Sequence, residues 1–125
     1  MTWKWQQSSH SWLHTYLGVT DIDTLTNQPV TTTNIVIEIV HYSVGPHIES
    51  TGGSGDIQSQ TLGTGQGYVL RGGRYIAVTW HRRDLLAPTT FTASNGQPVG
   101  LAPGRTWVEI MTTAQASNGG ISFTP

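Results

Sequence analysis

The clearest pattern of hydrophobic and polar positions along the chain lies at residues 34–42, NIVIEIVHY. The three isoleucines of this stretch fall at every second position, which places them on one face of a strand. The opposite face carries Val36, Glu38, Val40 and Tyr42, so it is mostly apolar as well. We assign the isoleucine face to the core and predict a central strand that is covered on both sides.

Other short stretches alternate in the same way and predict further strands. Residues 10–18 fit either a helix or a strand. We favour the strand, which places Trp12, His14 and Tyr16 on one side. Two glycines at 72 and 73, between apolar stretches, predict a hairpin with a tight turn. The remaining predicted strands are residues 2–6, 67–70, 75–80, 89–92 and 106–111.

These elements predict a mainly β protein: a single antiparallel domain, built as a sandwich or a partly open barrel of about eight strands. At most one short helix is expected, at residues 10–16 or 84–86. Residues 20–29 and 43–56 are rich in turn formers, and we expect loops there. One domain spans residues 1–125, with a core of residues 2–111 and a flexible tail at 112–125.

Composition removes several classes of function. The 125 residues suit one domain and contain no cysteine, which excludes a disulfide framework, a thiol nucleophile and thiolate metal sites. The formal net charge is -1, so a basic nucleic-acid binder is not expected. No apolar stretch reaches the ~18–20 residues of a membrane helix, and no signal peptide is recognisable at the N-terminus.

The order of motifs in the second half of the chain resembles a known family. A Gly-x-Gly pair leads into a hairpin, a Thr-Trp pair and a basic residue follow, and a Pro-Gly turn precedes the last strand. The motifs in chain order are Gly65 and Gly67, Gly73-Arg74, Thr79-Trp80, Arg82 or Arg83, Pro88-Thr89-Thr90-Phe91, Asn95-Gly96, Pro103-Gly104-Arg105-Thr106-Trp107 and Ile110. With Asp23 and the stretch 34–37 upstream, they resemble the C-terminal domain of the YerB-like bacterial lipoproteins, domain-of-unknown-function family 3048.

The resemblance covers roughly residues 12–111 and implies an extracytoplasmic, cell-envelope setting. It implies that full-length relatives carry a lipid anchor and a larger preceding domain. It supplies no reaction, cofactor or catalytic residue, and we expect no cofactor and no metal. The stretch 52–56 is longer and richer in glycine than the family pattern leads us to expect.

Aromatic residues are the main candidates for binding. Trp3, Trp5 and Trp12 lie in a polar N-terminal stretch, where exposed aromatic rings suit a sugar or a peptide. The favoured alternative is that these tryptophans pack on the sheet. Trp80 and Trp107 alternate with apolar residues and are assigned to the core.

Arginines form the second candidate group. Arg71, Arg74, Arg82 and Arg83 all belong to the predicted hairpin or its exit, and together they suit a carboxylate or phosphate ligand. The plainer interpretation is a solvated rim with one salt bridge to Asp84. We select Arg82 and Arg83 as binding residues.

Catalytic and metal arrangements are less favoured. His10 and His14 are four residues apart, but the local sequence offers no third ligand. A hydrolase acting on an envelope polymer would use Asp23, Glu38 or His81, although a carboxylate at Glu38 is better explained by a structural pair with an arginine.

The function predicted from sequence is therefore a non-catalytic cell-envelope module that binds a partner protein or a cell-wall glycan. The binding residues are expected to be Trp3, Trp5, Trp12, Arg82 and Arg83. Two alternatives stay open, the hydrolase and a structural domain that docks on a preceding N-terminal domain. An exposed apolar face favours docking, and a groove with converging carboxylates favours an enzyme.

Overall fold

The computed structural model describes residues 1–48, 55–59 and 61–124. Within them the chain forms thirteen strands, nine of them longer than two residues, and one short helix. The prediction of a mainly β domain with at most one short helix is confirmed. The helix lies at Thr113–Ser117, however, and the two positions suggested for it are occupied by strand β2 and by a turn. No helix in the described part of the chain is long and apolar enough to cross a membrane.

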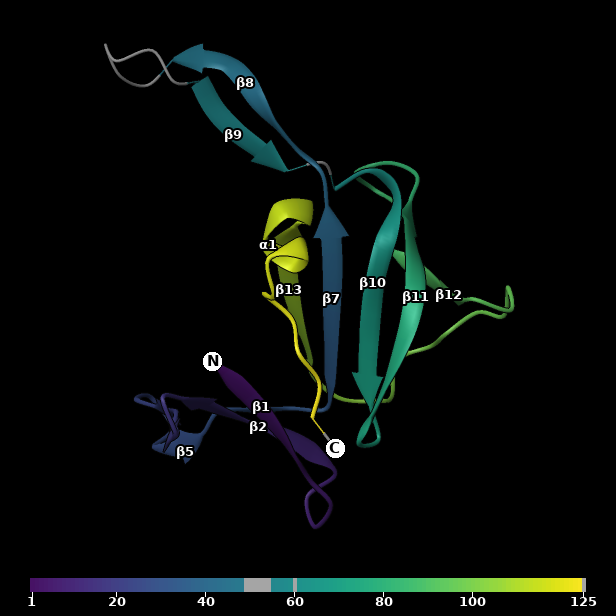
Figure 1. Ribbon diagram of the computed structural model, residues 1–125. Helices are drawn as coiled ribbons and strands as arrows, with labels where there is room; N and C mark the ends of the chain where they lie inside the picture. The colour runs from purple at the N-terminus through teal and green to yellow at the C-terminus, as the bar shows by residue number, and fades with distance from the viewer. Residues whose placement is uncertain (49–54, 60, 125) are drawn as a thin grey trace.

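A five-stranded sheet forms the body of the domain, in the order β12-β11-β10-β7-β13 (Figure 1). β10 and β11 form the predicted hairpin, and their register is continuous from Gly63↔Arg82 to Arg71↔Arg74. The turn between them places Gly72 and Gly73 at φ 58° and 78°, which glycine adopts without steric strain. The strands are β7 (Asn34–Val40), β10 (Gly63–Arg71), β11 (Arg74–Arg82), β12 (Thr90–Ala93) and β13 (Thr106–Thr112).

Strand β13 departs from the expected antiparallel arrangement, because it pairs with β7 in parallel. The chain leaves β12 at one edge of the sheet and reaches the other edge through residues 94–105. Asn34 anchors this crossing: its Nδ2 donates to the carbonyl oxygen of Ala102 at 2.8 Å, and its Oδ1 accepts from the Ala102 amide at 3.0 Å. Asn34 is completely buried, so these bonds satisfy polar groups that water cannot reach.

A smaller sheet lies across the lower end of the large one (Figure 1). It contains β1 (Thr2–Gln6), β2 (Ser11–Tyr16), β3 (Val19–Thr20) and β6 (Thr31–Thr32). The strand preference for residues 10–18 is thus confirmed by β2. The expected loop at residues 20–29 is wrong in part, because β4 (Ile22–Asp23) and β5 (Gln28–Pro29) pair there.

A second hairpin corrects the loop expected at residues 43–56. β8 (Tyr42–Ile48) and β9 (Gly55–Ser59) pair antiparallel with a register shift between Val44 and Ile48. The hairpin extends beyond the upper end of β7 (Figure 1). Residues 49–54, which include most of the glycine-rich stretch, lie outside the described residues.

Both faces of the large sheet bury apolar side chains, as predicted for β7. One face, the valine face, carries a core of Val36, Val40, Val69, Val78, Trp80 and Phe91. The opposite face, the tyrosine face, carries Ile35, Leu70 and Tyr68, which pack with Trp12 from the small sheet. The assignment of the isoleucines to the main core is wrong in detail. Ile37 and Ile39 are half-buried, whereas Val36 and Val40 are 1% exposed, because the larger cluster forms on their side.

The helix α1 packs against β13 and β7 on the tyrosine face (Figure 1). Thr112 and Gln115 form a capping box at its N-terminus, which supplies partners for two backbone amides. Beyond the helix the chain runs back along the sheet, and Phe123 packs against Tyr68. The segment expected as a flexible tail therefore contains a helix and a packed aromatic ring.

Candidate functional site

The three N-terminal tryptophans pack between the two sheets. Trp12 is only 7% exposed and belongs to the core with Ile35 and Leu70. Trp3 and Trp5 are half-buried against that core, and the Trp5 and Trp12 rings meet edge to face at 5.1 Å. The structure supports the alternative in which these tryptophans pack on the sheet. The prediction that Trp12 is an exposed binding residue is wrong.

Trp3 also joins a partly exposed aromatic cluster with His14 and Trp107. The ring centroids of Trp3 lie 4.6 Å from His14 and 5.2 Å from Trp107. The assignment of Trp107 to the core is wrong, since its side chain lies on the edge strand β13 and is 38% exposed. Trp80, by contrast, is confirmed as a core residue at 2% exposure.

The histidines do not pair as a metal site. Both ring nitrogens of His14 have neighbours: Nδ1 lies 3.0 Å from Oδ2 of Asp21, and Nε2 lies 3.2 Å from Sδ of Met1. His10 is exposed in the turn between β1 and β2, at a positive φ of 49°. Among the described residues, no group of three histidine, aspartate or glutamate side chains is placed to hold a metal ion.

The four arginines of the hairpin separate into two pairs. Arg71 and Arg74 lie at the turn, and Arg82 pairs with Gly63 at the opposite end of the ribbon. Because the strands between them are nine residues long, the four cannot hold one ligand. Arg83 forms the predicted salt bridge with Asp84 at 3.1 Å, in an exposed position where such a pair contributes little stability.

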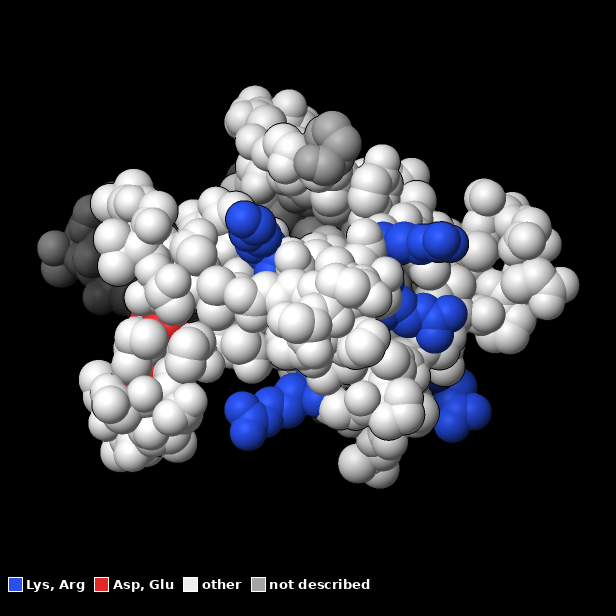
Figure 2. Space-filling view, turned by 90° about the horizontal axis from the view of Figure 1, so that it is seen from below, with Lys and Arg blue, Asp and Glu red and all other residues white. Residues whose placement is uncertain are grey.

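The basic side chains of the molecule do not form one continuous patch in the view from below (Figure 2). Seen from below, the Lys and Arg side chains lie on several sides of the centre of the view, and those on the right lie closer together (Figure 2). Arg82 uses its Nη2 to donate to the carbonyl oxygen of Leu85 at 3.0 Å, which closes the turn after β11. Arg82 and Arg83 therefore have local structural partners, and no bound anion is needed to explain them.

The residues suggested for a hydrolase lie apart. Glu38 is 7% exposed on the valine face, and burial raises the pKa of its carboxyl group, while the charge of Arg82 lowers it to a smaller extent. His81 lies on the tyrosine face and its Nε2 meets Oγ1 of Thr92 at 3.1 Å. Asp23 belongs to the β4–β5 pair, where its carboxylate accepts from the Leu25 amide. These three groups do not converge on one substrate position.

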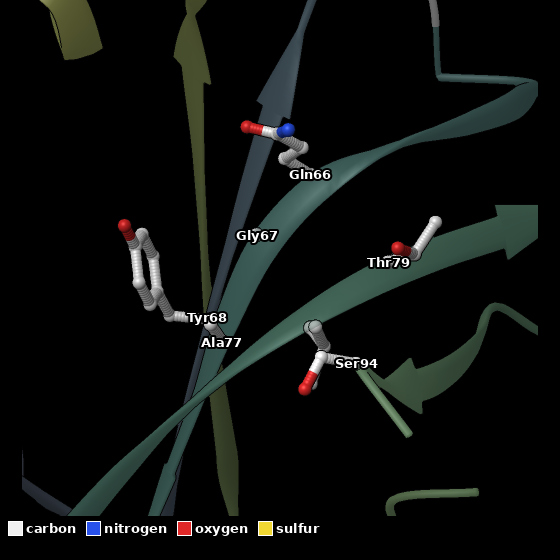
Figure 3. Close-up of a pocket in the computed structure, with 7 residues that line it drawn as sticks. Gln66, Gly67, Tyr68, Ala77, Thr79 and Ser94 are labelled. Atoms are coloured by element: carbon white, nitrogen blue, oxygen red, sulfur yellow. The ribbon is translucent and has the colours of Figure 1, made fainter. Parts of the chain in front are cut away.

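A hollow of about 260 Å³ lies on the large sheet between β10, β11 and the end of β12. Gln66 and Tyr68 come from β10, Ala77 and Thr79 from β11, and Ser94 follows β12. In Figure 3 Tyr68 lies on one side of the hollow, and Thr79 and Ser94 lie on the other. The hollow therefore offers amide and hydroxyl groups beside an aromatic ring, and none of its lining residues is charged.

An aromatic platform adjoins this hollow through Tyr68. Tyr75, which is 55% exposed, lies 6.3 Å from Tyr68 at an angle of 68°. Phe123 stacks on Tyr75, with ring centroids 4.0 Å apart and planes only 7° from parallel. Tyr68, Tyr75 and the hollow together form what we call the tyrosine site.

Sequence reasoning did not combine these residues into a site. The alternation along β11 does place Tyr75, Ala77 and Thr79 on the face opposite Val78. The part of the site that β11 contributes was therefore predictable from the sequence. The other half depends on the register Gln66↔Thr79 and Tyr68↔Ala77, which pairs the two strands residue by residue. Phe123 lies 48 residues after Tyr75 in the chain, and no sequence pattern near either residue predicts that their rings stack.

Comparison with known proteins agrees with the motif order. The chain matches the family described as "Protein of unknown function (DUF3048) C-terminal domain" over residues 1–108. The crystal structure of YerB from Bacillus subtilis is similar, with a TM-score of 0.65 and 24% sequence identity. The match covers 87% of this chain and 34% of the YerB chain, so the chain spans about a third of that protein. No protein with a curated description matches. The chain belongs to the DUF3048 C-terminal domain family.

Proposed function

We propose that this domain is a non-catalytic binding module of the cell envelope, and that it binds its ligand at the tyrosine site. The observation that carries the proposal is the hollow itself, lined by Gln66, Thr79 and Ser94 beside Tyr68. A binding site typically has a small number of converging polar groups beside apolar or aromatic side chains, and these polar groups orient the ligand. Gln66, Thr79 and Ser94 are exposed, so a ligand reaches them without opening the fold.

The separation of the titratable groups supports a non-catalytic role. A retaining or inverting hydrolase needs two carboxyl groups that face each other across the scissile bond. Glu38 lies on the valine face, and Asp23 lies in the β4–β5 pair. Neither lines the hollow.

The envelope setting rests on the resemblance to the YerB-like lipoproteins. Its motifs run in the family's order, and the family match covers residues 1–108. On this proposal the domain acts outside the cytoplasm, where cell-wall glycans and envelope proteins are the available ligands. In longer relatives, a lipid anchor attaches the equivalent domain to the membrane.

The test is cosedimentation of the purified domain with an isolated envelope fraction. We expect saturable binding that Thr79→Lys weakens at least about tenfold, because a lysine places a charge and a long side chain over the hollow. Thr20→Lys, in the exposed strand β3, is the matched control and keeps the binding of the unsubstituted domain. Absence of saturable binding, or equal loss in both variants, contradicts the proposal.

A second candidate function, docking on another protein or domain, is favoured by strand β13. This strand is an edge of the large sheet, and Trp107, Val108 and Ile110 are 38%, 52% and 47% exposed. Exposed apolar side chains on an edge strand are typical of a surface that pairs with another chain. The domain also corresponds to only 34% of YerB.

Hydrogen exchange distinguishes this second candidate. In YerB, docking predicts that the strand equivalent to β13 is better protected in the full-length protein than in the isolated C-terminal domain. Equal exchange rates in the two forms contradict docking at this edge.

A further inference from the structure

We propose that the Tyr68–Tyr75 platform is the stacking position for a sugar ring of a neutral glycan, and that Phe123 covers it in the free protein. This inference rests on the proposed function and names its ligand class. It begins from the stacked pair, in which Phe123 lies parallel to Tyr75 at 4.0 Å. Tyr75 thus already accepts a flat six-membered ring on its face.

The chemistry of the surroundings selects a neutral sugar. A pyranose ring offers a C–H face for an aromatic ring and hydroxyl groups around its edge. The hollow that begins at Tyr68 continues with the amide of Gln66 and the hydroxyls of Thr79 and Ser94, which both donate and accept hydrogen bonds. An anionic polymer would require basic partners, and none of the residues that line the hollow is charged.

The position of the hollow in the sheet disfavours a peptide that adds a strand. Such a peptide pairs with the free backbone groups of an edge strand. At Tyr68, β10 is paired with both β7 and β11, and at Thr79, β11 is paired with both β10 and β12. The pairing with β12 covers only residues 78–81, so at Tyr75 the backbone of β11 has a paired neighbour on one side. Recognition in the hollow must therefore use side chains, as glycan recognition does.

The covering segment is held by two backbone hydrogen bonds to α1 and by the packing of one aromatic ring. Within residues 118–124, the backbone amides of Asn118 and Gly120 donate back to α1, at 3.1 Å to Ala114 and 2.9 Å to Gln115. Beyond them the Phe123 ring, which is half-buried between the exposed Ser122 and Thr124, packs against Tyr68 and Tyr75 and against the cluster of Trp12, Ile35 and Leu70. A ligand can replace this ring without breaking the hydrogen bonds of any strand.

Competition for one ring has a measurable consequence. If Phe123 occupies the platform in most molecules, the apparent dissociation constant of a glycan is the intrinsic constant divided by the uncovered fraction. Removing the Phe123 ring then tightens binding, although it removes an aromatic contact from the folded protein. A merely structural role for Phe123 predicts the opposite sign.

The experiment is a calorimetric titration of the full chain with chitohexaose, a neutral β-linked oligosaccharide. We expect binding that Tyr75→Ala weakens at least about tenfold and Phe123→Ala tightens at least about threefold. Tyr16→Ala is the matched control, because Tyr16 is a similarly exposed strand tyrosine on the small sheet, and it should leave the affinity unchanged. The circular dichroism of each variant confirms that it is folded.

A measurement without substitutions accompanies the titration. Chitohexaose should shift the ring proton resonances of Phe123 toward those of a solvated phenylalanine in the unsubstituted protein. Unmoved Phe123 resonances at saturation, or an unchanged or weaker affinity in Phe123→Ala, overturn the covering role. No binding of chitohexaose, combined with Thr79-dependent binding to the envelope fraction, overturns the glycan inference and leaves the proposed function standing. Loss of that envelope binding on protease treatment identifies a protein ligand and likewise overturns the glycan inference.

Discussion

The indole of Trp80 lies directly on the backbone of Gly65. A Cβ atom at Gly65 would lie 2.6 Å from Nε1 of Trp80, closer than any real contact allows. The indole crosses this position to donate a 3.1 Å hydrogen bond to the carbonyl oxygen of Ile39 on β7. Gly65, the first glycine of the Gly-x-Gly pair, thus makes room for the core of the valine face.

Substitution of Gly65 by alanine should therefore destabilise the fold by about 1–3 kcal/mol, since the buried ring has no room to move. Urea denaturation measures the free energy of unfolding. Gly100→Ala is the control, because nothing lies within 4 Å of its built Cβ. Equal stability of the two variants would contradict the close contact.

The two buried tryptophans should respond differently to loss of the indole N–H. Trp80 donates to Ile39, whereas Nε1 of Trp12 has no partner among the described residues. We expect Trp80→Phe to cost about 1 kcal/mol more than Trp12→Phe in thermal or urea unfolding, because it also leaves the Ile39 carbonyl without this donor. A larger cost for Trp12→Phe would show that its indole N–H has a partner in solution.

Asn34→Ala should destabilise the protein by about 3 kcal/mol and loosen the crossing that leads to β13. The substitution removes the partners of both the N–H and the C=O of Ala102. Asn34→Asp keeps an acceptor for the Ala102 amide, but it buries a carboxylate that faces the Ala102 carbonyl oxygen, so its cost should be at least as large. The rate of amide hydrogen exchange at residues 102–106 should increase in Asn34→Ala. An unchanged rate there would show that the Asn34 side chain does not anchor the crossing.

Glu38 should make stability depend on pH. Burial raises its pKa in the folded protein above the ordinary value of 4.5, so its contribution to stability is full below that value and is lost as the pH rises through the folded pKa. The free energy of unfolding of Glu38→Gln should therefore fall less over that range. Arg82→Gln should move the loss to higher pH, since the charge of Arg82 lowers the pKa.

Urea midpoints measured at intervals from about pH 4 to about pH 8 give these profiles. Arg83→Gln is the matched control for Arg82→Gln, because Arg83 pairs with Asp84 on the surface. Superimposable profiles for the unsubstituted protein and Glu38→Gln would falsify the role of Glu38.

Much of the local structure was predictable from residue pattern. The alternation at residues 2–6 predicted β1 with the bounds that it has in the structure, and Gly72-Gly73 predicted the hairpin turn. These features depend on side-chain period and on the φ angles of single residues, which are local properties. The hairpin β8–β9 escaped prediction because Gly45 and Pro46 are turn formers in most contexts, yet β8 includes both.

The candidate site was predictable only in fragments. Trp12 was chosen for its polar neighbours along the chain, but its neighbours in space are Ile35 and Leu70. Arg71 and Arg82 were grouped because both belong to one hairpin, but they lie at opposite ends of it. Trp107 was assigned to the core because its strand is apolar, and the sheet order then placed that strand at an edge.

The sequence by itself determined the β class, the main strands and the family, because the side-chain alternation, the turn residues and the motif order are written along the chain. Only the tertiary structure decided which face of each strand is buried, that β13 joins β7 in parallel, and that Phe123 lies on Tyr75. Those outcomes depend on pairings between residues far apart in the chain. The preferences of each segment leave such pairings open, and the packing of the whole molecule selects one of them.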